Sequence, residues 1–213
     1  MDRKKYSYAM SSHKQTIDTY NASAEALAEY FKGIGPRTEH IDRALELAGV
    51  QDGSARLVEI GCGDGRDAEV IIGKVQEYIG FDPSDSMLKL ARKRLPAANF
   101  VLADSLSFNY PANLDVVLAF ASFIHSDRQT NAQVFNKLAQ AVRIGGIVMV
   151  NVRERDAYEE QLQPDQFGTR MYFYYTPKVI LELAGLNFKQ VYEDHAQIGQ
   201  NTWLTMALER ILV

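Results

Sequence analysis

Cysteine is almost absent from this sequence: Cys62 is the only one in 213 residues. A lone cysteine excludes an intramolecular disulfide and any metal site built from several thiolates. Basic residues are also scarce, since 23 Lys and Arg stand against 27 Asp and Glu, a formal net charge of −4. A protein that neutralises many phosphates has the opposite balance. We therefore expect a cytoplasmic protein in a reducing setting, with no nucleic acid as a partner.

Long apolar runs are missing as well. No stretch reaches the roughly 18 apolar residues of a membrane-spanning helix. The basic segment MDRKKYSYAMSSHKQT has no apolar stretch behind it, so we expect neither a membrane partner nor a cleaved leader. With 46% hydrophobic residues, the chain suffices for one well-buried core and is too short for two ordinary domains. We predict a single domain over residues 1–213. Composition does not distinguish a monomer from a homodimer.

The stretch LVEIGCGDGRD, residues 57–67, organises the rest of the chain. Apolar, partly β-branched residues lead through Glu59 into Gly61, Gly63 and Gly65. This is the pattern of a buried strand that enters a glycine-rich turn and then a helix. Glycine suits such a turn because it adopts positive φ and lets a ligand approach the backbone closely.

After residue 55, apolar strand patterns alternate with helical patterns. The expected strands cover 56–60, 76–81, 99–103, 115–120 and 147–152, and the expected helices cover 66–72, 84–94 and 127–143. Asp127 is the expected N-cap of the last helix, and Gly145 and Gly146 are expected to close it. Such alternation predicts an α/β fold with a parallel sheet covered on both faces.

The N-terminal residues have other patterns. Residues 1–15 are polar and are expected to be mobile. Apolar spacings of three and four predict a helix over 17–31, and Pro36 is expected to start a second helix that stops at Gly49. Two helices should therefore precede the first strand.

The C-terminal part changes character at residue 153. Residues 153–175 are charged and then aromatic, as in an insertion that holds a short strand or a lid. Thr176 and Pro177 should cap and begin a helix that Gly185 stops. Strand patterns over 188–194 and 202–209 then predict an antiparallel hairpin appended to the sheet.

From the turn EIGCGDG to the final hairpin, the chain resembles the class I S-adenosylmethionine-dependent methyltransferases, and most of all their small-molecule branch. The resemblance implies a Rossmann-like α/β sandwich whose mostly parallel, seven-stranded sheet has the order 3-2-1-4-5-7-6, with strand 7 antiparallel. It also implies S-adenosylmethionine as the cofactor, S-adenosylhomocysteine as its product, no metal, and a small-molecule methyl acceptor. Residues 1–50 would form a helical lid, and the insertion would cover the active site.

By this resemblance, cofactor-binding residues lie at successive strand ends. Asp82 would accept hydrogen bonds from both ribose hydroxyls, although it could instead cap the helix that begins near Ser84. Asp104 would receive the adenine amino group, although an Asp in a loop also serves turns. Glu59 would hold the backbone amides of the glycine turn. The expected set is Glu59, Gly61, Cys62, Gly63, Asp64, Gly65, Asp82, Pro83, Met87, Ala103, Asp104, Ser105 and Phe120.

His125 is the candidate catalytic residue. An imidazole with an ordinary pKa near 6.5 can deprotonate a nucleophile close to neutral pH. The alternative is a structural hydrogen bond at the start of the next helix. Its stretch AFASFIHSD lacks the Asn-Pro-Pro-aromatic signature that the resemblance associates with methylation of bases and protein amides. A sulfonium methyl is already activated, so positioning and exclusion of water can suffice without a base.

The candidate substrate residues come from the two covering segments. Tyr20 and the stretch 170–175 are expected to form two sides of a lid. Tyr172 and Tyr174 either contact substrate or pack on the core as alternating strand residues. Arg153 and Arg170 either bind a substrate carboxylate or phosphate, or pair with the acidic residues around them.

Two other functions stay open beside a methyltransferase. A nicotinamide-dependent oxidoreductase shares the acidic residue after the second strand, but its fingerprint is G-x-G-x-x-G, whereas this chain has G-x-G-x-G. A methyltransferase-fold protein can also bind cofactor or a partner without catalysing transfer. The glycine spacing favours the methyltransferase over the oxidoreductase, and no pattern identifies the methyl acceptor.

Overall fold

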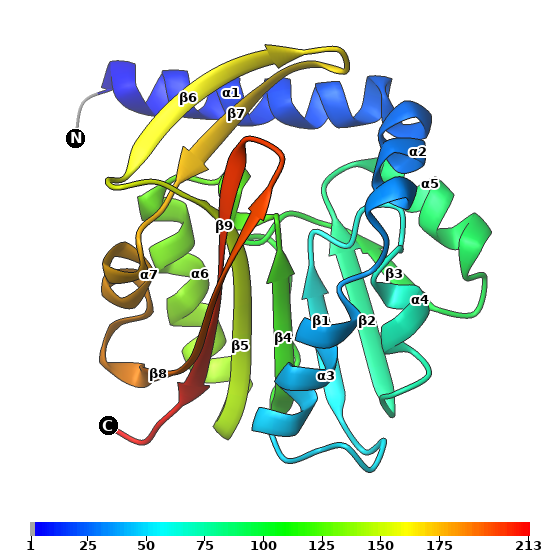
Figure 1. The fold of residues 1–213 in the computed structure, drawn as a ribbon, viewed down its shortest axis with the longest axis vertical. Coiled ribbons are helices and arrows are strands. Elements are labelled where there is room, and N and C mark those ends of the chain that lie inside the picture. Colours follow the sequence, from blue (N-terminus) through cyan, green and yellow to red (C-terminus); the bar gives the residue numbers. More distant parts are fainter. Residues whose placement is uncertain (1–2) are drawn as a thin grey trace.

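The computed structural model describes residues 3–213, with side chains described from residue 12 onward. Its centre is a seven-stranded sheet in the order β3-β2-β1-β4-β5-β9-β8 (Figure 1). The strands are β1 Arg56–Ile60, β2 Glu77–Asp82, β3 Asn99–Leu102, β4 Leu114–Phe120, β5 Val142–Glu154, β8 Phe188–Ile198 and β9 Asn201–Arg210. Counted along the chain within this sheet, the order is the predicted 3-2-1-4-5-7-6.

Strand directions also follow the prediction. Strands β3, β2, β1, β4 and β5 pair in parallel, and β9 runs antiparallel to both β5 and β8. The strand labels exceed seven because a separate hairpin, β6 (Glu159–Asp165) and β7 (Gly168–Tyr174), lies between β5 and β8 in the chain. All parallel strands therefore present their carboxyl ends at one edge.

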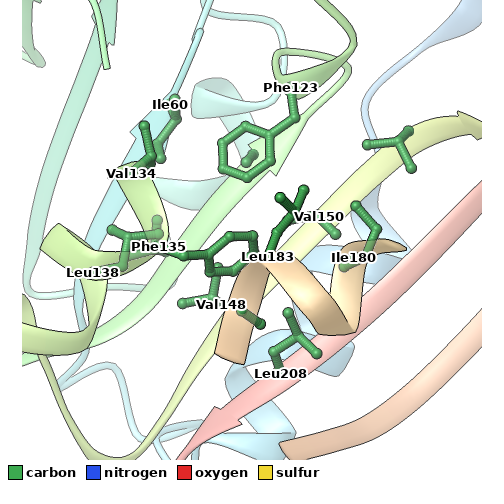
Figure 2. Close-up of a cluster of buried hydrophobic side chains, with 14 of the residues drawn as sticks. Ile60, Phe123, Val134, Phe135, Leu138, Val148, Val150, Ile180, Leu183 and Leu208 are labelled. Carbon is green, nitrogen blue, oxygen red and sulfur yellow. The ribbon is translucent and has the colours of Figure 1, made fainter. Parts of the chain in front are cut away.

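Helices cover both faces of the sheet because its central strands are apolar on both sides. On one face, α6 (Arg128–Ala141) and α7 (Pro177–Ala184) pack on the strands. Figure 2 shows part of this cluster, which includes Phe135 and Leu138 of α6, Ile180 and Leu183 of α7, and Val150 of β5. On the other face, α3 (Thr38–Leu47) and α4 (Ala68–Ile71) join a second cluster.

The N-terminal expectations were wrong in two respects. Residues 3–15 of the segment expected to be mobile belong to α1 (Arg3–Ala22), and residues 1–2 lie outside the described residues. In place of one helix over 17–31, α1 is followed by α2 (Ala24–Ile34) with a break at Ser23. The polar residues of α1 have partners on the hairpin. The Thr19 hydroxyl donates to the Thr169 carbonyl at 2.7 Å, and the Thr16 hydroxyl accepts from the Met171 amide at 2.9 Å. This contact places α1 across the carboxyl edge of the sheet (Figure 1).

Helix α3 ends as predicted and starts later than predicted. It begins at Thr38 rather than Pro36, because the backbone amide of Arg37 donates to the Asp67 carboxylate at 2.8 Å. At the other end, Gly49 has a φ of 70° and closes the helix, as expected.

The two glycines expected to end α6 lie inside β5 instead. The chain passes from Ala141 directly into the strand at Val142. A Cβ at Gly146 would lie 3.0 Å from the Asp115 carbonyl oxygen, so glycine permits close approach to β4 near its register shift.

Helix α5 (Asp85–Arg94) packs against β3, and the predicted caps of α6 and α7 are confirmed. Asp127 accepts from the Thr130 amide at 2.7 Å, and Thr176 accepts from the Val179 amide at 3.1 Å. Among residues 3–213, no helix is both long and apolar enough to cross a membrane.

Candidate active site

A cavity of about 1120 Å³ opens at the carboxyl ends of the central strands, with α1, α2 and β7 contributing to its walls. Most of the residues singled out from the sequence line it. They are Tyr20, Glu59, Gly61, Cys62, Gly63, Asp64, Asp82, Pro83, Met87, Asp104, Ser105, Phe120, His125, Arg153, Arg170 and Tyr172. Gly65, Ala103 and Tyr174 do not line the cavity.

The backbone conformation of the turn after β1 requires glycine at two positions. Gly61 and Gly65 have φ values of 72° and 78°, and a Cβ at Gly61 would lie 2.6 Å from the Cβ of Ser122. Gly61 therefore lets the turn meet the end of β4. The amides of Gly61 and Cys62 both donate to the Phe81 carbonyl, at 2.8 and 3.0 Å. These bonds tie the turn to the end of β2.

Asp82 ends β2 and faces the turn. Its Oδ2 accepts from the Gly63 amide at 3.0 Å, and its Oδ1 accepts from the Ser84 amide at 2.8 Å. Burial raises the pKa of Asp82 to about 6 despite these two bonds. Each oxygen retains capacity for a further hydrogen bond, which suits a pair of ligand hydroxyls. The N-cap alternative is wrong, because Ser84 itself caps α5 by accepting from the Met87 amide.

Asp104 combines a turn role with a place in the cavity wall. Its Oδ1 accepts from the amides of Leu106 and Ser107, at 2.8 and 2.9 Å, which confirms the turn alternative. Its other carboxylate oxygen makes no hydrogen bond with the described residues. The turn contacts therefore leave an acceptor available for a ligand.

Two other residues of the glycine turn are engaged within the protein. Asp64 is buried and forms an ion pair with Arg94 of α5. Cys62 is buried against Ala68 and Leu88, and burial raises the pKa of its thiol, which lowers its nucleophilicity. Cys62 is a packing residue that also borders the cavity.

Glu59 lies under the turn, but it does not hold the turn's amides as expected. Its carboxyl group accepts a hydrogen bond from the Tyr78 hydroxyl at 2.5 Å. A Cβ at Gly80 would lie 2.3 Å from that hydroxyl, so the missing side chain makes this contact possible. Burial, and then the negative charge of Asp67, raise the pKa of Glu59 to about 8. Glu59 is therefore mostly protonated at neutral pH.

This raised pKa predicts how stability changes with pH. A group whose pKa is higher in the folded state contributes stability that is complete below its unfolded pKa, about 4.5, and is lost as pH rises through about 8. We expect Glu59→Gln, which stays neutral, to lie within about 1 kcal/mol of wild type in urea unfolding at pH 5. At pH 8.5 its free energy of unfolding should be higher by about 4 kcal/mol, because the folded and unfolded pKa values of about 8 and 4.5 are far apart.

The matched control is Glu69→Gln, because Glu69 pairs with Arg94 at the surface with 58% of its side chain exposed. The difference in free energy of unfolding between Glu69→Gln and wild type should not grow with pH. Parallel pH profiles for wild type and Glu59→Gln would show that Glu59 does not hold a proton in the folded protein.

A buried ion cluster that sequence reasoning missed lies next to Glu59. Asp67 accepts from Arg37 Nη1 at 2.9 Å and from Arg66 Nη2 at 3.1 Å. Burial alone would raise the pKa of Asp67, but the two arginines outweigh it and hold the pKa below its ordinary value. The cluster joins the segment before α3 to the helix after the glycine turn. No sequence signal distinguishes these charges from ordinary surface residues.

His125 is hydrogen-bonded through both ring nitrogens. Nδ1 lies 2.7 Å from the Met171 carbonyl, which can only accept, so Nδ1 carries the proton. Nε2 therefore accepts from the Tyr20 hydroxyl at 2.9 Å, and that hydroxyl accepts from Arg170 Nη1 at 3.3 Å. Burial lowers the pKa of His125 to about 3. His125 thus has structural hydrogen bonds, but to α1 and β7 rather than at the start of the next helix as the alternative had it. Action as a base would require Tyr20 to release Nε2.

The cavity wall includes one aromatic residue that the sequence did not indicate. Trp203 of β9 lines the cavity and lies directly opposite Arg153 of β5 in the sheet. Gln163 of β6, which does not line the cavity, donates to the Tyr174 hydroxyl at 2.6 Å. Tyr174 is buried beneath Gln163 and Arg155, outside the cavity. No group of three or more potential metal ligands is found in the described part of the chain.

Comparison with known proteins gives a domain match and partial matches to named relatives. Residues 57–146 match the family model of a methyltransferase domain. A trans-aconitate 2-methyltransferase from Methylobacterium nodulans is 34% identical over 127 residues, which is 59% of this chain and 48% of the relative. Another from Acidovorax sp. is 33% identical over 119 residues, 54% of this chain and 45% of the relative. The match thus spans less than half the length of these relatives.

Solved structures resemble the whole fold. The 1,6-didemethyltoxoflavin-N1-methyltransferase of Burkholderia thailandensis, with its substrate and S-adenosylhomocysteine bound, has a TM-score of 0.70 at 16% identity and covers 100% of this chain and 92% of its own. The 4+2 cyclase SpnF has a TM-score of 0.72 at 15% identity, over 95% of this chain and 98% of its own. At such identities the likeness concerns the fold alone.

Proposed function

We propose that the protein methylates a small molecule, because residues 57–146 match the model of a methyltransferase domain and the fold resembles that of a solved small-molecule methyltransferase. The observation that carries the proposal is the Asp82 carboxylate beside the glycine turn. It faces the cavity with hydrogen-bonding capacity left on both oxygens. We propose a cytoplasmic location, which agrees with the single cysteine.

The residues around Asp82 fit S-adenosylmethionine. Asp82 would hold the ribose hydroxyls, and Met87 and Pro83 would cover the adenine. The turn at Gly61 and Gly63 presents backbone without side chains to the methionine part. A Cβ at Gly61 would strike Ser122, so the turn keeps this shape only with glycine. When bound, the cofactor supplies a methyl group on a sulfonium, which is electrophilic without further activation.

The other half of the cavity would hold the methyl acceptor. Tyr20, His125 and Arg170 form a connected network there, which keeps the wall rigid. We propose that α1, α2 and the β6–β7 hairpin act as the lid, since they cover the strand ends and would exclude water during transfer. The chain would contribute mainly positioning, because the low pKa of His125 makes it a weak base.

Trans-aconitate is the first acceptor to test, because the relatives named above carry that substrate in their names. This chain matches less than half of their length, so their specificity is a starting point for the assay. A second candidate function is cofactor binding without methyl transfer, because one fold can carry different functions and a protein named as a cyclase has this fold.

Methyl transfer can be tested with S-adenosylmethionine carrying a trideuterated methyl group. The protein is incubated with this cofactor and a metabolite pool that includes trans-aconitate, and products are identified by mass spectrometry. We expect a labelled product that is missing without enzyme. Binding of S-adenosylhomocysteine with no labelled product from any acceptor would favour the binding protein over the methyltransferase.

A further inference from the structure

Arg153 is a cavity-lining arginine without an acidic partner among the described residues. It lies at the carboxyl end of β5, at the acceptor half of the cavity. The other lysines and arginines described in the cavity wall all form ion pairs: Lys14 with Asp18, Arg37 and Arg66 with Asp67, and Arg170 with Asp165. The positive charge of Arg153 is therefore available to a ligand.

The backbone of Arg153 is fixed on both sides. Arg153 pairs with Trp203 of β9 on one side, and its carbonyl accepts from the Tyr175 amide at 2.9 Å on the other. Its guanidinium carbon lies 4.0 Å from the centre of the Tyr172 ring and 5.7 Å from that of Trp203. Both aromatic contacts restrict the orientation of the guanidinium plane, and they leave its charge uncompensated.

The hydrogen bonds of Arg153 are incomplete. Nη1 donates to Gln163 Oε1 at 3.2 Å, and the amide nitrogen of Gln163 is engaged by Gln161 and Tyr174, which orients the oxygen toward the arginine. Nε of Arg153 is buried and has no hydrogen-bond partner within the part of the chain whose side chains are described. A guanidinium offers five donors, and a buried donor without an acceptor is destabilising. The side chain is thus held in place with donors to spare.

We propose that Arg153 binds a carboxylate group of the methyl acceptor. The inference rests on the proposed function, since it names the chemical class of that acceptor. The planar guanidinium matches a carboxylate through two parallel hydrogen bonds. A carboxylate also matches the single unpaired charge, whereas a phosphate monoester carries about −1.5 to −2 at neutral pH. Arg153 then selects acids over neutral molecules of the same shape.

The test is calorimetric titration of the full chain, saturated with S-adenosylhomocysteine, with paired probes. Acetate, succinate, benzoate and trans-aconitate are each compared with the corresponding amide, and inorganic phosphate is added as a separate arm. At least one carboxylate should bind about 10-fold or more tightly than its amide. Arg153→Gln should remove that preference. Arg153→Lys should retain only part of it, because lysine keeps the positive charge but cannot form two parallel hydrogen bonds to a carboxylate.

Arg155→Gln is the matched control, because Arg155 also lies over a tyrosine ring, that of Tyr174, but pairs with Glu159 outside the cavity. It should preserve the preference for acids. Equal binding of S-adenosylhomocysteine by wild type and Arg153→Gln would show that the variant is folded.

Three results would overturn the inference while leaving cofactor binding intact. They are a wild type that prefers no carboxylate, an Arg153→Gln variant that keeps the preference, and tighter binding of phosphate than of every carboxylate. An Arg153→Gln variant that is folded by circular dichroism but loses S-adenosylhomocysteine binding would assign Arg153 to the cofactor instead. Failure of wild type to bind S-adenosylhomocysteine would contradict the proposed function itself.

Discussion

Replacing Asp82 by alanine should weaken binding of S-adenosylhomocysteine by at least about 100-fold. Two ligand hydroxyls would lose a charged acceptor, and hydrogen bonds to charged groups contribute about 1.5–3 kcal/mol each. The substitution also removes the acceptor of the Gly63 amide, which orders the turn. Calorimetric titration measures the affinity directly, and an unfolding curve shows whether the variant is folded.

The pH dependence of wild type gives an independent check on Asp82. Ligand hydroxyls donate to the ionised carboxylate, and burial sets its pKa at about 6. Affinity should be level above pH 7 and should fall toward about 10-fold per unit well below pH 6. Asp85→Ala is the control, since Asp85 pairs with Lys89 at the surface of α5, the helix that follows Asp82. Unchanged affinity in a folded Asp82→Ala protein would remove Asp82 from the site.

Replacing Asp67 by alanine should lower the free energy of unfolding by about 3–5 kcal/mol. The change leaves Arg37 and Arg66 without their counterion while their side chains stay only 20% and 12% exposed. Removing one member of a buried ion cluster costs this much because the remaining charges are uncompensated. It also frees the Arg37 amide, which now donates to Asp67. Urea unfolding at pH 7 measures the difference.

Asp42→Ala is the matched control for this ion cluster. Asp42 pairs with Lys74 and has 53% of its side chain exposed, so its loss should cost less than about 1 kcal/mol. A loss below 1 kcal/mol for Asp67→Ala as well would mean that water reaches the cluster and that it does not fix the segment before α3.

The sheet could be predicted because its signals are local. Each parallel strand contains a short apolar run, and the turn after β1 needs glycine where a Cβ would strike Ser122. The signal for the final hairpin is also local, since β8 and β9 pair across a short turn. Such patterns act within a few residues, and the alternation of strands and helices then limits the topology.

The N-terminal helices and the end of α6 could not be predicted because distant residues decide them. Polar residues of α1 find partners on β7, 150 or more positions away, so a segment with weak apolar periodicity still forms a helix. Gly146 looks like a helix stop in the sequence, yet it allows β5 to approach β4. Tertiary contact outweighed the local pattern in both places.

The two halves of the cavity also differ in how far the sequence predicts them. Most of the predicted cofactor residues follow the consecutive strands β1, β2 and β3, so the parallel strands bring them to one edge of the sheet. Their roles in binding stay predictions. The part of the cavity proposed to hold the acceptor joins Tyr20, His125, Arg153 and Trp203 from four separate elements. A sequence lists these residues without relating them, because only the folded chain brings α1 and the hairpin over the sheet.

The central claim is that the cavity binds an S-adenosyl cofactor, and calorimetric titration of the wild-type chain with S-adenosylhomocysteine and NAD tests it most directly. Near-stoichiometric binding of S-adenosylhomocysteine, with no heat from NAD at the same concentrations, is the predicted result. Binding of NAD without binding of S-adenosylhomocysteine would contradict the claim.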